Sequence, residues 1–161
     1  GILQERLHAL NDLALTLKHV HWNVVGPHFI AVHEMIDPQV EAVRGFADDL
    51  AERIATMGGS PKGTPGSIVD NRSWEEYSLG RGTTQEHLGA LDLVYQGVIS
   101  SYRSGIKELG DLDPVTEDMF ISQTDKLELF HWFIRAHLED KGGSLSTEGA
   151  SSEKDAAQSA G

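Results

Sequence analysis

Histidines and carboxylates at helical spacing mark the stretch between His21 and Glu52 as a place where chemistry could occur. His33 and Asp37 are four residues apart, and so are Asp48 and Glu52, so each pair can project from one side of a helix. At about 100° of rotation per residue, all four side chains share a sector about 100° wide. Imidazole nitrogens and carboxylate oxygens are suitable ligands for a hard, redox-active divalent metal such as iron. The pattern predicts an N/O metal site.

The distance between the two pairs shows that one helix cannot complete this site. Asp37 and Asp48 are eleven residues apart, which is about 16 Å along a helix, whereas metal ligands lie within about 2–2.6 Å of the ion. An antiparallel second copy of the helix, crossing near Ala42, would place His33 and Asp37 of one subunit opposite Asp48 and Glu52 of the other. A twofold interface of this kind creates two equivalent sites at once.

His21 lies on the apolar stripe of the preceding helix, together with Leu17 and Val24. A lone histidine on such a stripe is more often a hydrogen-bonded core residue than a ligand. A short turn at Gly26-Pro27 folds this helix back beside the next one, however, and so brings His21 near the first pair. We therefore expect five ligands in a dinuclear-type site between subunits: His21, His33, Asp37, Asp48 and Glu52.

Composition restricts the classes of protein that this chain can represent. Its 161 residues suit one domain, and it contains no apolar run that approaches the ~20 residues of a membrane span. The absence of cysteine excludes disulfides and thiolate metal sites, and it is compatible with a reducing cytoplasm. A net charge of −12 opposes phosphate binding and favours attraction of cations.

Periodicity and helix-boundary signals predict an all-α fold with four long helices. We expect them at about 2–25, 30–57, 83–109 and from Pro114 to 139. A Gly/Pro/Ser-rich connection over 59–81 would carry a short helix at 73–77, capped by Ser73 with Glu76 in a capping box. One long crossover suits a ferritin-like four-helix bundle. We assign residues 1–140 to the bundle and 141–161 to a mobile Ser/Gly/Ala-rich tail.

The sequence leaves two alternatives to an iron site between subunits. Glu5-His8 and Glu128-His131 are Glu-x-x-His pairs, the arrangement that bundle di-iron proteins use inside one subunit. Glu5 and His8 lie off the apolar stripe of their helix, and residues 83–109 offer no inward glutamate. We assign both pairs to the surface or to ordinary packing. A structural zinc site at the five predicted ligands is the remaining alternative.

The segments HVHWN, GPHFIAVHEMID and DDLAERI resemble the Dps mini-ferritins, the DNA-binding proteins from starved cells, and the resemblance extends over nearly the whole chain. It implies a ferritin-like homo-dodecamer of 23 symmetry that is built from twofold dimers, with a ferroxidase centre at each twofold interface. By match to the motif, His21, His33 and Asp37 come from one subunit and Asp48 and Glu52 from its partner.

The same resemblance implies a cytoplasmic ferroxidase that stores iron, and it allows association with the nucleoid. It would bind up to two iron ions per site, oxidise Fe(II) with hydrogen peroxide in preference to oxygen, and deposit ferric mineral in the cavity. Trp22 would intercept oxidising equivalents or serve as a packing aromatic, and Asp113, Glu117 and Asp118 would line the iron-entry pores. Several family members bind DNA through lysine-rich termini, but the last twenty residues here hold one lysine and three acids. A DNA-compacting protein with little redox role is the alternative function.

Overall fold

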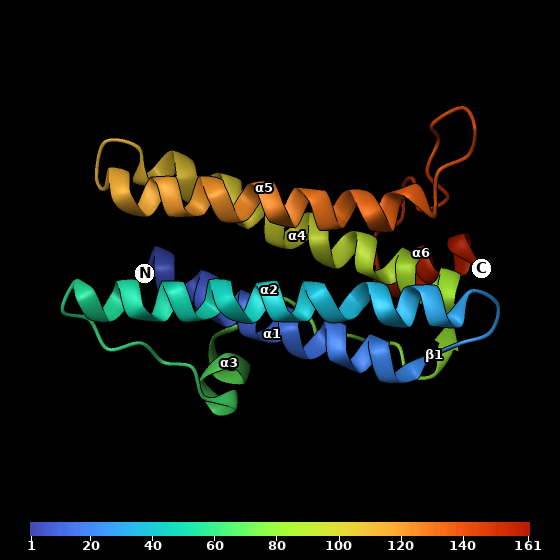
Figure 1. The fold of residues 1–161 in the computed structure, drawn as a ribbon, viewed down its shortest axis with the longest axis horizontal. Helices are drawn as coiled ribbons and strands as arrows, with labels where there is room; N and C mark the ends of the chain where they lie inside the picture. Colours follow the sequence, from blue (N-terminus) through green and yellow to red (C-terminus); the bar gives the residue numbers. More distant parts are fainter.

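The computed structural model describes residues 1–161 as six helices and two very short strands (Figure 1). Their order and bounds are α1 (Ile2–Asn23), β1 (Val24–Val25), α2 (Phe29–Thr56), α3 (Pro65–Asn71), β2 (Gly82–Thr83), α4 (Thr84–Leu109), α5 (Pro114–Ala136) and α6 (Glu153–Ala160). The predicted all-α, ferritin-like bundle is therefore confirmed, with the four long helices close to their expected positions.

Local sequence signals explain where the long helices begin. Thr83 caps α4 through a complete capping box, in which its side chain accepts from the backbone N–H of Glu86 while the Glu86 side chain accepts from the backbone N–H of Thr83. Asp113 caps α5, and Pro114 occupies the first turn, where its missing N–H costs nothing. Helix α2 continues through Pro38 without interruption.

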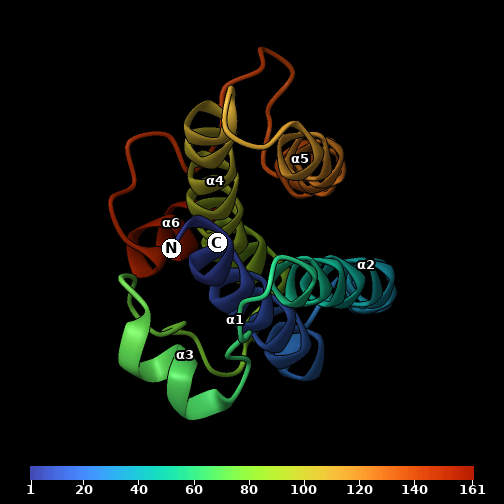
Figure 2. The same ribbon diagram turned by 90° about the vertical axis from the view of Figure 1, so that its left-hand side faces the viewer.

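The long helices form two antiparallel pairs, α1 with α2 and α4 with α5 (Figure 1). Seen end-on, α1 and α4 lie near the centre, α2 and α5 lie on one side, and α3 and α6 lie on the other (Figure 2). A parallel two-residue pairing of β1 with β2 ties the turn after α1 to the start of α4. No helix is apolar over a stretch long enough to cross a bilayer.

One contiguous core of 23 buried apolar residues holds the bundle together. It includes two fully buried tyrosines of α4, and each donates its hydroxyl to a glutamine. Tyr95 donates to Gln39 on α2 at 2.6 Å, across the two helix pairs, and Tyr102 donates to Gln123 on α5 at 2.8 Å, within one pair. Burial raises the pKa of both phenols far above the ordinary value. They are therefore neutral donors that fix the register of the helices.

The short helix in the crossover lies at Pro65–Asn71, not at the predicted 73–77. Residues after Arg72 stay extended because side-chain contacts with the bundle outweigh the local capping signal. Trp74 donates its indole N–H to Asp12 at 2.7 Å, and Tyr77 bonds to His87 at 2.9 Å. Tertiary packing has overridden local propensity here.

The C-terminal residues also differ from the expected mobile tail, because the structure places helix α6 against α4. Ser152 caps α6 by accepting from the N–H of Asp155, and Ala156 and Ala157 are buried against α4. The composition pointed to disorder because these residues are small and polar, yet small residues are what allows two helices to approach closely. The domain limit at residue 140 remains a prediction.

Candidate metal centre

A tight turn between α1 and α2 brings His21 and His33 together. Gly26 has φ +93° and His28 has φ +63°, both in the left-handed region, which glycine adopts at little cost and other residues adopt rarely. The chain reverses within these residues, so the end of α1 lies beside the start of α2. The predicted approach of His21 to the first pair of α2 is observed.

The two imidazoles hold each other through reciprocal hydrogen bonds to the backbone. His21 Nδ1 lies 2.9 Å from the carbonyl oxygen of His33, and His33 Nδ1 lies 2.8 Å from the carbonyl oxygen of His21. The rings stack with centroids 3.6 Å apart and an interplanar angle of 21°. A carbonyl only accepts, so each Nδ1 must carry the proton, and each Nε2 of the neutral ring keeps its lone pair. This is the arrangement found in metal-ligating histidines, and it fits iron as a bound ion.

Asp37 lies next to this pair but has a cationic partner. Its Oδ1 accepts from Lys18 Nζ at 2.6 Å and lies 3.4 Å from His21 Nδ1. The hydrogen bond from Lys18 lowers the pKa of Asp37 below its ordinary value, and the nearby imidazoles act in the same direction, while burial opposes the shift. Sequence reasoning missed Lys18, although it lies three residues before His21, on the same side of α1.

The second carboxylate pair has no such support within the protomer. Asp48 and Glu52 are exposed on α2, and their side chains make no hydrogen bond or ion pair. No group of three or more histidines and carboxylates converges within one protomer. The structure thus brings together His21, His33 and Asp37, but not Asp48 and Glu52. Completion of the site by a partner subunit remains a prediction.

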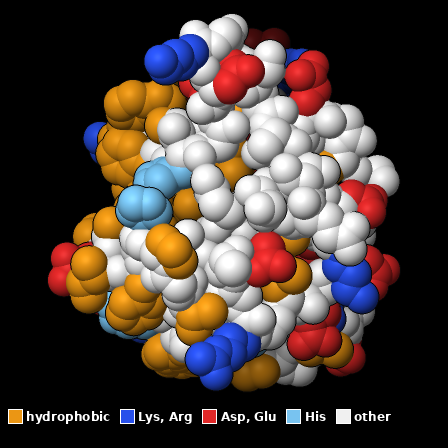
Figure 3. Space-filling view, turned by 90° about the vertical axis from the view of Figure 1, so that its right-hand side faces the viewer, with side chains coloured by type: hydrophobic (Ala, Val, Ile, Leu, Met, Phe, Trp, Pro, Cys, Tyr) orange, Lys and Arg blue, Asp and Glu red, His pale blue; other side chains and the backbone are white.

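Trp22 projects from the end of α1 beside this cluster. It is 71% exposed, and Phe29 and Ile30 at the start of α2 are exposed too. Apolar and histidine side chains gather on one side of this end of the molecule (Figure 3). Within one protomer Trp22 is therefore not a core packing residue.

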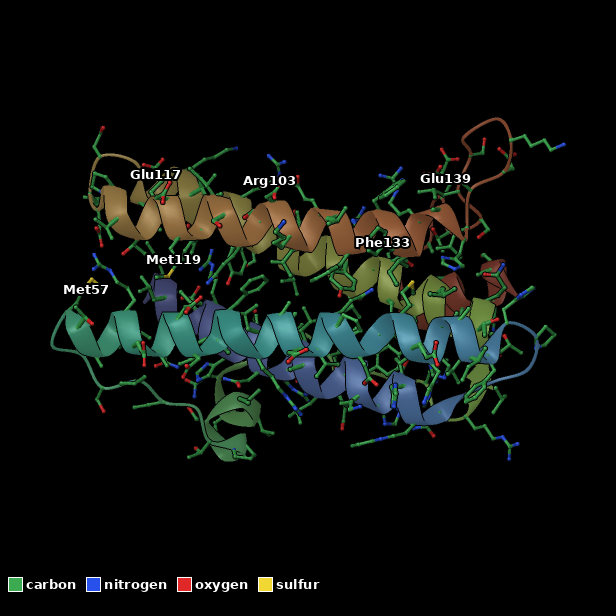
Figure 4. All side chains as sticks on the ribbon, in the orientation of Figure 1. Met57, Arg103, Glu117, Met119, Phe133 and Glu139 are labelled. Atoms are coloured by element: carbon green, nitrogen blue, oxygen red, sulfur yellow. The ribbon has the colours of Figure 1, made fainter.

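The predicted pore residues fall at the opposite end of the bundle, where α5 begins (Figure 4). Asp113 already has hydrogen-bond partners in its own chain. Both its carboxylate oxygens accept from Arg53, at 3.0 and 2.8 Å, and they also accept from the hydroxyl and the N–H of Thr116. These bonds lower its pKa to about 2. Glu117 and Asp118 have no side-chain partners. The pore role of all three remains a prediction.

The four residues of the two Glu-x-x-His pairs all contact other groups of the chain. His8 is buried and contacts the carbonyl oxygen of Lys62 at 3.1 Å, whereas Glu5 pairs with Arg6. His131 instead donates Nε2–H to Asp92 on α4, at 2.6 Å, while Glu128 pairs with Arg103. Assignment of both pairs to ordinary packing agrees with these contacts.

Asp92 is a buried carboxylate that the sequence analysis overlooked. Its second oxygen accepts from Thr147 Oγ1 at 2.7 Å, so it joins α4, α5 and the C-terminal segment. Burial opposes its ionisation, but the bonds from His131 and Thr147 outweigh that effect and lower its pKa. The only sequence signal was one acid within the otherwise apolar stripe of residues 88–95.

Comparison with known proteins agrees with this fold and these residues. The model of the ferritin-like domain matches residues 1–141. The DNA protection during starvation protein of Mycolicibacterium smegmatis is 62% identical over 159 residues, which is 99% of this chain and 87% of that protein.

Solved structures give the same result. Mycobacterium smegmatis Dps superposes with a TM-score of 0.92 at 63% identity, over 93% of this chain and 86% of that one. DpsA14 from Streptomyces coelicolor superposes with a TM-score of 0.89 at 63% identity, over 90% and 86% of the two chains. The fold, the paired histidines and these similarities together show that the chain belongs to the Dps family of ferritin-like proteins.

Proposed function

We propose that this protein is a ferroxidase that stores iron, with active sites divided between two protomers. The observation that carries the proposal is the reciprocal bonding of His21 and His33, which fixes both rings with Nε2 available. Asp37 lies beside the pair, with its Oδ1 3.4 Å from His21 Nδ1, and Asp48 and Glu52 of a second protomer would complete the set. Each α2 supplies one half of two sites, as an antiparallel twofold contact requires.

Iron is the substrate of this site, and the balance of the reaction is simple. Two Fe(II) lose one electron each, hydrogen peroxide accepts both, and with two protons it yields two water molecules. Hard carboxylate ligands favour Fe(III) over Fe(II) because their charge compensates the charge of the oxidised ion. Taking both electrons at one site avoids release of a hydroxyl radical. We propose peroxide as the preferred oxidant and oxygen as the slower one.

The charge of the chain supports storage in a closed assembly. A dodecamer of 23 symmetry carrying −12 per chain would concentrate cations within its cavity and nucleate ferric mineral there. Glu117 and Asp118, which have no internal partners, are the better candidates for an entry pore than Asp113. Trp22, exposed beside His21, would be the first aromatic to meet an oxidising equivalent. We place the protein in the cytoplasm.

Mixing two inactive variants tests the division of the site directly. His33→Ala removes one half of each site, and Asp48→Asn with Glu52→Gln removes the other half. When the two variants are co-assembled in equal amounts, half the dimers are mixed, and each mixed dimer regains one intact site of two. Activity of about one quarter of the wild-type value is expected, measured as the initial rate of peroxide-dependent Fe(II) oxidation by stopped-flow absorbance.

The matched control is each variant assembled alone, which should be nearly inactive. A site contained within one protomer would give no recovery on mixing, and that result would refute a divided site. The particle mass of each assembly shows whether a loss of activity reflects loss of the dimer. The same traces recorded with oxygen in place of peroxide test the oxidant preference.

DNA compaction is the competing function, since relatives are named for DNA protection. The acidic chain and the C-terminal segment, where Lys154 stands among Glu148, Glu153 and Asp155, support weak or no DNA binding at physiological salt. A gel-shift titration at two salt concentrations measures this. A tight, salt-sensitive shift would contradict the expectation. His33→Ala leaves compaction intact if DNA binding is the primary role, and abolishes oxidation if the ferroxidase proposal is correct.

A further inference from the structure

A groove runs along α1 and α4. Figure 2 shows that α3 and α6 flank this face of the bundle, opposite α2 and α5. It has a volume of about 980 Å³ and is closed at its sides by residues 71–78 of the crossover and 151–154 before and within α6. Its apolar lining includes Leu13, Leu93, Val94 and Val98. None of the residues of the proposed metal centre line it.

The chain itself shows that this face of α4 accepts a helix. Gly89, Leu93, Gly97 and Ser101 form a row at four-residue spacing, the kind of row into which a second helix packs. Helix α6 occupies the first position so closely that a Cβ on Gly89 would lie 2.5 Å from the carbonyl oxygen of Ala156. At Gly97 a Cβ would meet nothing within 4 Å. The row is therefore filled at one end and open at the other.

The open part has the dimensions of a short helix. Eight helical residues are about 12 Å long and about 10 Å wide, which corresponds to about 900 Å³. The groove volume of about 980 Å³ matches this. The groove is therefore similar in volume to a short helix, and the open position at Gly97 leaves room for an apolar helical face on α4.

The negative charge of the groove favours a helix that carries basic residues. Five carboxylates line it against one lysine: Glu5, Asp12, Glu75, Glu76 and Glu153 against Lys154. Arg6 pairs with Glu5, and Arg72 pairs with Asp12 and Glu76. Glu153 accepts hydrogen bonds from the N–H and the hydroxyl of Ser78, but neither Glu153 nor Glu75 has a cationic partner. Helix α6 of a second copy, with Glu153 and Asp155 against Lys154, would bring like charge to like charge.

We propose that this groove is a docking site for an amphipathic helix of a partner protein, whose apolar face lies on Leu93 and Gly97 and whose flanking residues are lysine or arginine. Apolar burial would supply affinity, and complementary charge would supply specificity and speed of association. The interaction is independent of the ferroxidase proposal, because it uses none of the same residues.

The test uses the assembled full-length protein and a fluorescein-labelled synthetic peptide of about 14 residues of Leu, Ala and Lys, arranged as an amphipathic helix. Fluorescence anisotropy gives Kd. Gly97→Leu should weaken binding about tenfold, because the new side chain occupies the groove. The added Cβ meets nothing within 4 Å, and the substitution replaces glycine by a better helix former. Gly66→Leu is the matched control, since its Cβ also meets nothing within 4 Å but lies in α3, outside the groove.

Charge is tested by Glu75→Gln with Glu76→Gln, which should weaken binding several-fold at low salt. A peptide of the same composition in shuffled order should bind far more weakly. Binding that Gly97→Leu leaves unchanged, or equal binding of the shuffled peptide, would overturn the docking site. The proposal of a basic partner is wrong if the charge variant binds the original peptide as tightly as the wild-type protein does. It is also wrong if a peptide with Glu in place of Lys binds the wild-type protein as tightly as the original peptide.

Discussion

The two ends of α2 carry the two halves of the predicted metal site, and the structure places them in different surroundings. At the first end, His33 is bonded to the backbone of His21, and Asp37 is held by Lys18. At the other end, Asp48 and Glu52 extend into solvent without any partner. The first half is thus preorganised by the fold of one chain, whereas the second acquires its surroundings only from another molecule. Stability and activity should therefore respond differently to substitutions at the two ends.

Activity is where we expect the largest effect, and it should be the same at both ends. His33→Ala, and separately Asp48→Asn with Glu52→Gln, should each lower the rate of peroxide-dependent Fe(II) oxidation by at least about 100-fold, because each removes ligands from every site. Stopped-flow absorbance measures both. Equal losses support one site built from both ends, and a loss confined to His33→Ala would confine the chemistry to one end.

Stability should separate the ends. His21→Ala removes a buried ring and takes the imidazole donor from the carbonyl of half-buried His33, and should cost about 1–3 kcal/mol of unfolding free energy. Asp48→Asn, on the exposed side of α2, should change it by less than about 0.5 kcal/mol. Urea unfolding of the iron-free protein at equal concentrations compares them. A similar cost for both would show that the second end is also supported within the protomer.

A smaller effect is expected at Lys18, which contacts only the His33 and Asp37 end of α2 and should influence the affinity for Fe(II). In the iron-free protein its ammonium competes with metal for Asp37. Lys18→Met should therefore tighten binding of Fe(II) about threefold, as expected for one exposed ion pair. Anaerobic isothermal titration calorimetry measures the affinity, and Lys107→Met on α4 is the control for loss of a charge. Weaker binding in Lys18→Met would mean that the lysine instead positions the carboxylate.

The smallest effect concerns pH. The pKa of Asp37 is below its ordinary value of 3.8, so the ionised carboxylate stabilises the folded protein above that value. This contribution is lost as the pH falls through the lowered pKa. The melting temperature of wild type should exceed that of Lys18→Met slightly at pH 5, and the difference should disappear on acidification below 3.8. A difference that grows with acid would contradict this assignment.

The sequence predicted the parts of the fold that depend on local pattern. Helical periodicity and helix-boundary signals placed the long helices within a few residues. The helix expected at 73–77 was wrong, because Trp74 and Tyr77 bind the bundle through side chains far away in sequence. Helix α6 was not predicted for a related reason. Its packing against α4 depends on Gly89, which is over sixty residues earlier in the sequence.

The candidate site could be predicted to a similar degree. Spacing indicated that His21 would join His33 and Asp37, and the structure brings them together. The reciprocal backbone bonds could not be foreseen, since they require the left-handed turn at Gly26 and His28. Asp92 escaped notice because its neighbours are apolar, and only tertiary structure supplies its partners, His131 and Thr147.

The seat of α6 on Gly89 also determines where the chain leaves the bundle. Gly161 lies at the same end as β1, while the N-terminus lies toward the other (Figure 1). A reporter or enzyme joined genetically after Gly161 would therefore emerge near the turn that links the first two long helices. Thr147 remains bonded to Asp92, so Gly89→Ala, by dislodging α6, would lengthen the tether to such a passenger by the fourteen residues that follow Thr147, without altering the passenger itself.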